Sequence, residues 1–556
     1  MRRLRGLRLD GILRRCKGRV RPDQTGDLHA SLVQYHRYSI HHSEQQQMAS
    51  VRARDHQLYR CRFARPCGHW PRDRERIQVG EGLTSETDFP AAKGRSEPLI
   101  MADIPVASPT RLRCARATYG CARTFPSIRQ EKPLHEAVSR PSASSTPDIG
   151  HAEIRRRYAE QGTLIDDEAF PCLAEPLIID AATGSQVRDV AQRLHPLLER
   201  VAHLYSTEAA VRDGFPEYEP LARWLSHAHP LDPINRICRL DGIVSRAGVY
   251  KVIESNAVCP AGVAAVPRIH HIWREVFAAP ELPPSRPQPL VEDHPRFAQA
   301  LLACHREQFG SEARSAFVVT LRGRYQAEVP EIVQDLGALG VEAVTVDARS
   351  VRLHAGAVVD GRGRQADLVY ANLDQHDLIT DPELSGYFAA AVSGTACFVN
   401  PLLSQCIIGD KRALAVLSDP AFGAHFDDSE REFLDIHVPW TRLITRSDDT
   451  LLATLEADRD RFVLKPANRL CGEGVIVGEF VTQSQWRVAL SEATAGAYVA
   501  QEYCAPPFLA AHPELAVGLD VYLFNAEFVG YMARCSQNPV LNAAVGGRFL
   551  PVLEEK

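Results

Sequence analysis

A lysine at the end of one apolar run precedes a short glycine-bearing loop in the C-terminal third of the chain. Residues 461–480 read RFVLKPANRLCGEGVIVGEF, in which Lys465 ends a strand-like run and Gly472 and Gly474 close the loop. In a P-loop the lysine follows the glycines, so this is not a P-loop. Such a loop can still close over phosphates, because its amides donate hydrogen bonds and its lysine adds a point charge. The alternative is an ordinary hairpin with an exposed lysine.

Two carboxylates and a carboxamide are spaced to meet in a hairpin nearer the middle of the chain. The stretch RLDGIVSRAGVYKVIESN contains two β-rich runs around a glycine turn. If the strands pair about a turn centred between residues 247 and 248, Asp241 lies opposite Glu254. Arg239 then lies opposite Asn256 on the same face, because side chains alternate along a strand.

This set of oxygen donors suits magnesium, which prefers carboxylate, carbonyl and water oxygens. Carboxylates placed directly opposite each other repel, and a bound cation removes that cost. The alternative is a solvated polar hairpin in which Arg239 neutralises one acid. The hairpin therefore predicts either a magnesium platform or a neutralised surface.

The glycine loop and the carboxylate hairpin together resemble the ATP-grasp ligases, which pair a lysine-bearing glycine lid with a Glu-x-Asn metal site. In the usual order Glu-x-Asn follows the lid, whereas here Glu254-Ser255-Asn256 precedes Lys465. That order resembles the circularly permuted branch, which includes glutathionylspermidine synthetase and eukaryotic-type glutathione synthetase. The RLD and ESN pair is similar to the Arg-x-Asp and Glu-x-Asn motifs of glutathionylspermidine synthetase. The resemblance covers roughly residues 160–556.

The resemblance implies a metal site and two nucleotide lysines. Its magnesium ligands would be Asp241, Glu254 and Asn256. Lys465 would be the lid lysine, and Lys411, in IIGDKRALAVLSD, would be the second nucleotide lysine. The lid glycines Gly472 and Gly474 would complete the phosphate-binding loop.

The remaining matches place the adenine and the reacting groups. In YVAQEY, Gln501 and Glu502 would mark the hinge strand that receives adenine, partly through backbone groups. Arg239 and Arg534 would face the γ-phosphate and the acyl phosphate as catalytic residues. Asn542 and the pair at residues 546–547 resemble the glycine-bearing segment that closes the C-terminal end.

The expected fold class is α/β, a circularly permuted ATP-grasp fold with antiparallel nucleotide-binding sheets and a small parallel α/β lobe. Residues 315–371 alternate strand, helix and strand, which predicts the parallel sheet. Residues 185–204 carry an apolar stripe at helical spacing, with Ser185 as a candidate N-cap. The expected parts are a basic extension (1–150), a helical part with the magnesium hairpin (151–310), a βαβ lobe (311–400) and the lid with the C-terminal part (401–556).

The implied activity is an ATP- and Mg2+-dependent carboxylate–amine ligase that forms an amide bond through an acyl phosphate. Its substrates would be a small-molecule carboxylate and an amine, or a peptide acceptor. The chain departs from glutathionylspermidine synthetase because no amidase domain is recognisable, the lid has only two glycines, and Cys471 lies within it. The alternative from a different class of function is a non-catalytic ATP-binding sensor or scaffold. Neither the substrates nor the oligomeric state is predicted.

The charge is divided unevenly along the chain. Residues 1–150 hold 27 Lys and Arg against 15 Asp and Glu, a net charge of +12, whereas residues 151–556 hold 37 against 54, a net charge of -17. We expect the basic part to be a disordered or non-native extension. A nucleic-acid arm or an organelle-targeting segment is the alternative, so a nucleic-acid partner is not the favoured expectation.

Composition also predicts the cellular location of the protein. No run of 18 or more apolar residues occurs, and residues 388–408 include polar residues and glycine, so we expect buried core there and no membrane partner. The 14 cysteines are scattered without a CxxC pair, and arginines stand where a secretion signal has its apolar centre. These features predict reduced thiols in a cytoplasmic protein.

Overall fold

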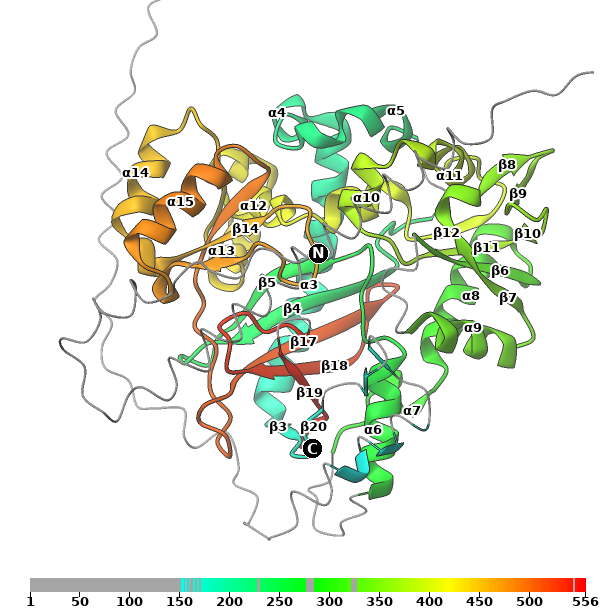
Figure 1. Cartoon of the computed structure of the whole chain (residues 1–556), viewed down its shortest axis with the longest axis horizontal. Coiled ribbons are helices and arrows are strands. Elements are labelled where there is room, and N and C mark those ends of the chain that lie inside the picture. The colour runs from blue at the N-terminus through cyan, green and yellow to red at the C-terminus, as the bar shows by residue number, and fades with distance from the viewer. Residues whose placement is uncertain are drawn as a thin grey trace, which may run out of the picture. The chain divides into compact units, whose positions relative to one another are not determined.

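The computed structural model describes residues 152–154, 156–157, 160, 164–165, 168–169, 172–227, 231–276, 285–321, 328–543 and 546–556. The basic extension expected at residues 1–150 lies outside these described residues. The described chain is a mixed α/β structure with antiparallel and parallel sheets, as the sequence predicts (Figure 1).

A five-stranded antiparallel sheet carries the predicted hairpin (Figure 1). Its strand order is β19-β18-β17-β4-β5, so the hairpin β4-β5 pairs with strands from the C-terminal end of the chain. Two further sheets have two short strands each, β20 with β3 and β1 with β2. The bounds are β1 Leu164–Ile165, β2 Glu168–Ala169, β3 Leu177–Ile179, β4 Ile237–Val244, β5 Tyr250–Asn256, β17 Ala516–Phe524, β18 Glu527–Ser536, β19 Arg548–Leu550 and β20 Val552–Glu554.

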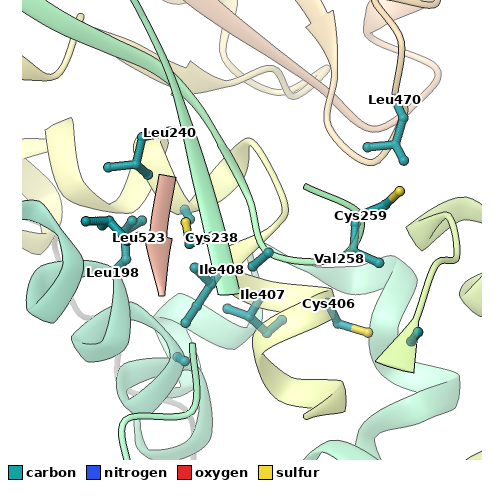
Figure 2. Packing of buried hydrophobic residues seen from close by; sticks show 14 of the residues in the cluster. Leu198, Cys238, Leu240, Val258, Cys259, Cys406, Ile407, Ile408, Leu470 and Leu523 are labelled. Atoms are coloured by element: carbon teal, nitrogen blue, oxygen red, sulfur yellow. The ribbon is translucent and has the colours of Figure 1, made fainter. Parts of the chain in front are cut away.

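Alternation along the central strands separates core from site. On β4, Cys238 and Leu240 belong to the main hydrophobic core, which leaves Arg239 and Asp241 on the opposite face. In Figure 2, Leu240 and Cys238 lie beside Leu523 of β17 and Leu198 of the long helix α3. The apolar face of the sheet is thus covered by α3, and its other face is free to carry polar residues.

The predicted helix at residues 185–204 is confirmed as part of α3 (Ala181–Thr207). The six residues of its apolar stripe are all buried: Val187, Val190, Leu194, Leu197, Val201 and Leu204. The predicted N-cap is wrong. The cap is Asp180, whose carboxylate accepts a hydrogen bond of 2.6 Å from the Thr183 amide. Aspartate is a strong cap, and the helix begins before the apolar stripe because its first turn needs no core contact.

A second antiparallel sheet carries the glycine loop. Its order is β13-β16-β14-β15, and α14 and α15 pack with it around a small core of their own. In Figure 1 these two helices lie beside β14. The bounds are β13 Thr441–Leu443, β14 Phe462–Pro466, β15 Ile476–Val477, β16 Tyr498–Glu502, α14 Asp449–Ala457 and α15 Gln483–Ala493.

The predicted parallel sheet is confirmed, with the order β12-β11-β6-β7 and parallel pairing throughout. A small antiparallel sheet, β10-β9-β8, lies within the same stretch of chain. The bounds are β6 Ser315–Thr320, β7 Glu342–Asp347, β8 Arg352–His354, β9 Ala357–Val359, β10 Gln365–Ala366, β11 Leu368–Ala371, β12 Cys397–Val399, α8 Arg296–Phe309, α9 Val329–Ala338, α10 Gln375–Thr380 and α11 Ser385–Ala391.

The remaining helices connect these sheets. A π-helical turn at Ser404–Ile408 places Ile407 and Ile408 in the main core, so the apolar segment around it is buried, as expected (Figure 2). Among the described helices, none is both long and apolar enough to cross a membrane. The bounds are α4 Ala209–Arg212, α5 Ala222–Leu225, α6 Ala265–Val276, α7 Pro289–Glu292, α12 Arg412–Ser418 and α13 Asp428–His437.

One buried asparagine joins the hairpin to the parallel sheet. The side-chain oxygen Oδ1 of Asn400 accepts hydrogen bonds from the backbone amides of Arg236 (2.9 Å) and Ile237 (3.0 Å). Its side-chain nitrogen Nδ2 donates to the backbone carbonyl oxygens of Ile237 (2.7 Å) and Ala257 (2.7 Å). Asn400 therefore ties the start of β4 to the residue that follows β5.

Replacing Asn400 with alanine should destabilise the protein by about 3–5 kcal/mol, because buried backbone groups would lose their only side-chain partner. The measurement is the midpoint of urea unfolding followed by circular dichroism. A loss below about 1 kcal/mol would show that water replaces the carboxamide.

Candidate functional site

The predicted hairpin register is confirmed where it matters for the site. Arg239 pairs with Asn256, and Asp241 pairs with Glu254. The predicted turn centre is wrong by half a residue, because pairing nearer the turn joins Val244 to Tyr250. A register shift after Asp241 makes up the difference, so β5 contains one extra residue there, a β-bulge.

Asp241 is at the centre of a buried charge network. Its Oδ1 accepts hydrogen bonds from Arg239 Nε (2.7 Å) and Asn256 Nδ2 (2.8 Å). Its Oδ2 accepts one from Arg534 Nη2 (2.5 Å) and a longer one from Arg239 Nη2 (3.4 Å). Burial alone would raise the pKa of Asp241, but the charges of Arg239 and Arg534 outweigh it, so the pKa is lowered. The carboxylate is therefore held ionised.

Asp520 on β17 is a site residue that the sequence analysis missed. Its Oδ2 lies 2.8 Å from Arg534 Nη2 and 3.9 Å from Arg239 Nε, and its Oδ1 accepts a 3.3 Å hydrogen bond from the Gly242 amide. Burial raises the pKa of Asp520, and the charge of Asp241 adds to the shift, although Arg534 opposes it. The available signal was a lone acid in the apolar strand LDVYLF.

Lys465 is buried at the end of β14, with 6% of its surface exposed. Its Nζ donates to Gln501 Oε1 (2.7 Å) and to the carbonyl oxygen of Ile253 (3.0 Å), the residue at the bulge. Gln501 in turn donates from Nε2 to Thr441 Oγ1 (3.1 Å). Both ends of the Gln501 carboxamide are thus hydrogen-bonded within the protein, to Lys465 and to Thr441, so the carboxamide does not face a bound adenine.

Burial lowers the pKa of Lys465 to about 8, and the nearby Lys411 adds to the shift, whereas Glu254 opposes it. A lysine with this pKa is partly neutral at mildly alkaline pH. Its charge, and any grip on a phosphate, is therefore lost as the pH rises through about 8.

Lys411 precedes α12 and reaches the other end of the hairpin. Its Nζ lies 3.1 Å from Glu254 Oε1 and donates to the carbonyl oxygen of Arg469 (2.7 Å), which belongs to the glycine loop. The side chain of Glu254 is 20% exposed. Lys411 thus joins the carboxylate hairpin to the glycine loop through one ammonium group.

The glycine loop between β14 and β15 has a left-handed backbone at three positions. Cys471, Gly472 and Gly474 have φ of 59°, 70° and 72°. Glycine adopts this conformation without the steric cost that a side chain brings, so the two glycines suit the loop and Cys471 is strained within it. At Gly472 an added Cβ would also lie 2.8 Å from Val540 Cγ1, in the C-terminal segment that lines the same cleft.

A cleft of about 750 Å³, including its open mouth, lies between the charged face of the hairpin and the glycine loop. Apolar residues including Ile253, Val463 and Val477 form part of its wall. Of the residues expected from the sequence, those that line it are Asp241, Glu254, Lys465, Gly472, Gln501, Glu502, Arg534 and Asn542.

The expected residues that do not line the cleft are Arg239, Asn256, Lys411 and Gly474. Arg239 and Asn256 contact Asp241, and Lys411 contacts Glu254, so all three support residues that do line it. Gly474 lies in the glycine loop itself, where its Cβ would meet Pro466 Cγ at 2.8 Å.

Comparison with known proteins finds similar structures but no sequence relative. No protein-family model matches the chain, and no curated protein matches it. A glutathione synthetase-like effector from Globodera pallida has a TM-score of 0.49 at 15% identity, over 74% of this chain and 98% of that one. A putative γ-glutamylcysteine synthetase from Methylobacillus flagellatus scores 0.37 at 14% identity, over 67% and 88%. At such scores neither likeness assigns the chain to a family.

At the end of the cleft lined by residues 501–504, the backbone amides are largely used by the protein itself. Gln501 is paired on both sides within its sheet, and the amides of Glu502 and Tyr503 bond to Trp440 and Arg461. Cys504 is the next residue that lines the cleft. At the C-terminal end, the Gly547 amide donates to the carbonyl oxygen of Asn542 (2.8 Å), which closes the glycine-bearing turn.

The donors around Asp241 suit a hard cation in type, since they are carboxylates and one carboxamide. Within the described residues, however, no three Asp, Glu, His or Cys side chains are arranged to hold a metal ion. The reason is visible in the contacts, because Arg534 and Lys411 lie against the oxygens of Asp241 and Glu254. A cation has access to these oxygens when Arg534 and Lys411 reorient toward a bound anion instead.

On the nucleotide-binding role proposed below for Lys465, the affinity of the cleft for ADP should fall as the pH rises above about 8, by up to about tenfold per pH unit, because neutral Lys465 binds phosphate poorly. The measurement is calorimetric titration of ADP from pH 7 to 10 with a chelator present. Lys465→Arg, which stays charged, is the control and should give a flatter profile. Unchanged affinity for ADP up to pH 10 would contradict a phosphate-binding role for Lys465.

Proposed function

We propose that the chain is a circularly permuted ATP-grasp enzyme, an ATP- and Mg2+-dependent carboxylate–amine ligase similar to glutathionylspermidine synthetase. The observation that carries this proposal is one cleft lined by a buried lysine, a buried arginine and two carboxylates: Lys465, Arg534, Asp241 and Glu254. The chain order supports the permutation, since hairpin β4-β5 precedes loop β14-β15. The substrates, a small carboxylic acid with an amine or peptide acceptor, are proposed by class.

The two lysines would hold the nucleotide phosphates. Lys465 and Lys411 now contact neutral carbonyl oxygens and Glu254, and these contacts are exchangeable for phosphate oxygens. A lysine acts as a point charge that tolerates such exchange. The proposed role of Gln501 is to hold Lys465 at the cleft, rather than to meet adenine directly.

The adenine would lie against the apolar wall formed by Ile253, Val463 and Val477. Glu502 and the backbone up to Cys504 border this end of the cleft and would supply its polar contacts. The glycine loop would close over the phosphates, since amides of such loops donate to anions and loops of this kind move as lids. Closure excludes water from the reacting groups.

Magnesium fits the proposed site by donor chemistry. Asp241, Glu254 and Asn256 would hold it, as the resemblance implies. When bound together with ATP it would supply charge neutralisation for phosphoryl transfer. Arg239 and Arg534 remain charged at all relevant pH, because their acidic partners raise the pKa of both.

Arg534 would donate hydrogen bonds to the transferred phosphoryl group and then to the oxyanion that forms when the amine attacks. Its Nη2 is already at the cleft, within 2.5 Å of Asp241 Oδ2. Donors placed where negative charge develops are worth about 3–4 kcal/mol each. Arg239 would support the same anion from behind Asp241.

The test is acid-dependent ADP formation by the full chain with ATP and Mg2+. Pools of carboxylic acids are offered with hydroxylamine as a general amine, and hydroxamate is read by colour. For any acid that responds, carboxylate labelled with 18O should pass label to inorganic phosphate, as an acyl phosphate requires. ADP formation without label transfer would contradict the mechanism, and failure to bind ATP would contradict the fold assignment.

A further inference from the structure

Asp520 is a buried carboxylate that the proposed reaction has not used. It is the only ionisable residue with an acidic or basic side chain in β17, whose sequence is AVGLDVYLF, and 1% of its surface is exposed. Its neighbours Leu519 and Val521 face the main core, while Asp520 lines the cleft. Burying a carboxylate is unfavourable unless it has a charged or hydrogen-bonding partner.

Asp520 extends the carboxylates of the hairpin into a row across three strands. Val521 pairs with Leu240, so the next position along places Asp520 beside Asp241, which pairs with Glu254. Like charges on adjacent strands repel each other. Two guanidinium groups reduce that repulsion: Arg239 lies 2.7 Å from Asp241 and 3.9 Å from Asp520, and Arg534 lies close to both aspartates.

Arg534 is shared between the two aspartates through one nitrogen. Its Nη2 lies 2.5 Å from Asp241 Oδ2 and 2.8 Å from Asp520 Oδ2. Arginine and carboxylate usually pair through two parallel hydrogen bonds, and Arg534 makes that pair with neither aspartate. Its Nε is buried and has no hydrogen-bond partner among the described residues. The guanidinium of Arg534 thus contacts both aspartates through Nη2 alone, and its Nε is an unused hydrogen-bond donor among the described residues.

We propose that Asp520 is a positioning residue of the ligase reaction, on which this inference rests: it holds Arg534 midway between two carboxylates. Without Asp520, Arg534 closes on Asp241 with two nitrogens. That movement takes a donor away from the anion in the cleft and strengthens the hold of Arg534 on Asp241, whose oxygens magnesium needs. Asp520 acts through Arg534 and does not itself contact the reacting atoms.

The variant Asp520→Asn keeps the shape of the side chain and removes its charge. We expect kcat to fall about a hundredfold, the loss that misplacing one catalytic group can cause, with the KM for ATP within about twofold because the phosphate lysines are untouched. In an Arg534→Gln background the same change should have almost no further effect, since residues that act as a unit are not additive. Additive losses would overturn the proposal.

A conservative variant separates positioning from packing. Asp520→Glu keeps the charge but adds a methylene to a packed strand, which disturbs structure more than Asn does. It should nevertheless retain at least about tenfold more turnover than Asp520→Asn. If Glu is as inactive as Asn or worse, with both proteins folded by circular dichroism, the role is structural and the proposal fails.

A binding readout keeps the two proposals apart. Affinity for a non-hydrolysable ATP analogue is titrated against Mg2+ in the unmodified chain, in Asp520→Asn and in Asp435→Asn, an exposed control on α13. In Asp520→Asn the Mg2+ concentration for half-maximal binding should rise about tenfold, because Arg534 is no longer shared with Asp520 and competes more strongly with Mg2+ for Asp241. If the unmodified chain ligates nothing, the proposed function fails and this shift still decides the role of Asp520; an unchanged Mg2+ requirement overturns it.

Discussion

Replacing Glu254 with glutamine should lower kcat by about a thousandfold while leaving the free energy of unfolding within about 1 kcal/mol. Glu254 lines the cleft, and its side chain is 20% exposed. Glutamine keeps its size but loses the charge that a divalent cation needs. Its ion pair with Lys411 is mostly buried, but the glutamine oxygen still accepts a hydrogen bond from Lys411, which also keeps the Arg469 carbonyl as a partner, so we expect little loss of stability.

The measurement is acid-dependent ADP formation together with thermal unfolding of the same samples. Glu432→Gln, on the exposed side of α13, is a matched control and should behave as the unmodified chain. Near-normal turnover by Glu254→Gln would mean that the hairpin does not hold the metal, whatever the lysines do.

The variant Lys465→Met should lower activity without lowering stability. Methionine fills the volume of the buried lysine without the charge, so the cost of burying an ammonium group disappears. That gain offsets the loss of the hydrogen bonds to Gln501 and Ile253, each worth about 1 kcal/mol. We therefore expect the melting temperature to stay the same or rise.

Nucleotide affinity should fall about a hundredfold in Lys465→Met, and turnover should fall further, because in the proposed reaction the lysine holds the phosphates throughout. Calorimetric titration of the ATP analogue and a melting curve on one preparation check both halves. A loss of binding accompanied by a fall of more than about 5 °C in melting temperature would indicate misfolding instead, since that shift corresponds to over 1 kcal/mol.

The sequence predicted the hairpin because its signal is local. Alternation and a glycine turn are enough to place Asp241 opposite Glu254, and the structure confirms that pairing. The bulge was not predictable, since no residue type in KVIES marks the extra position. The register near the site was right although the turn centre was wrong, because the bulge compensates for the shifted turn.

Contacts between distant segments could not be predicted in the same way. Asp520 is a lone acid in an apolar strand, and its meaning depends on β17 pairing with β4 across 278 positions of sequence. The Gln501 carboxamide was expected near adenine from its place in a hinge motif. Only the packing of β16 between β13 and β14 shows that it contacts Lys465 and Thr441.

The bulge in β5 has a consequence for how the hairpin tolerates change in length. Pairing on the turn side of the bulge and pairing on the site side follow different registers. A residue inserted into the turn at 245–249 can be absorbed before the bulge, where Val252 and Tyr250 pack. Deleting Ile253, the extra residue, would instead remove the bulge and still leave Glu254 opposite Asp241, whereas deleting Ser255 on the site side would turn the position of Asn256 to the other face. Length variation at the tip of this hairpin is therefore compatible with the site, and variation by one residue beyond the bulge is not.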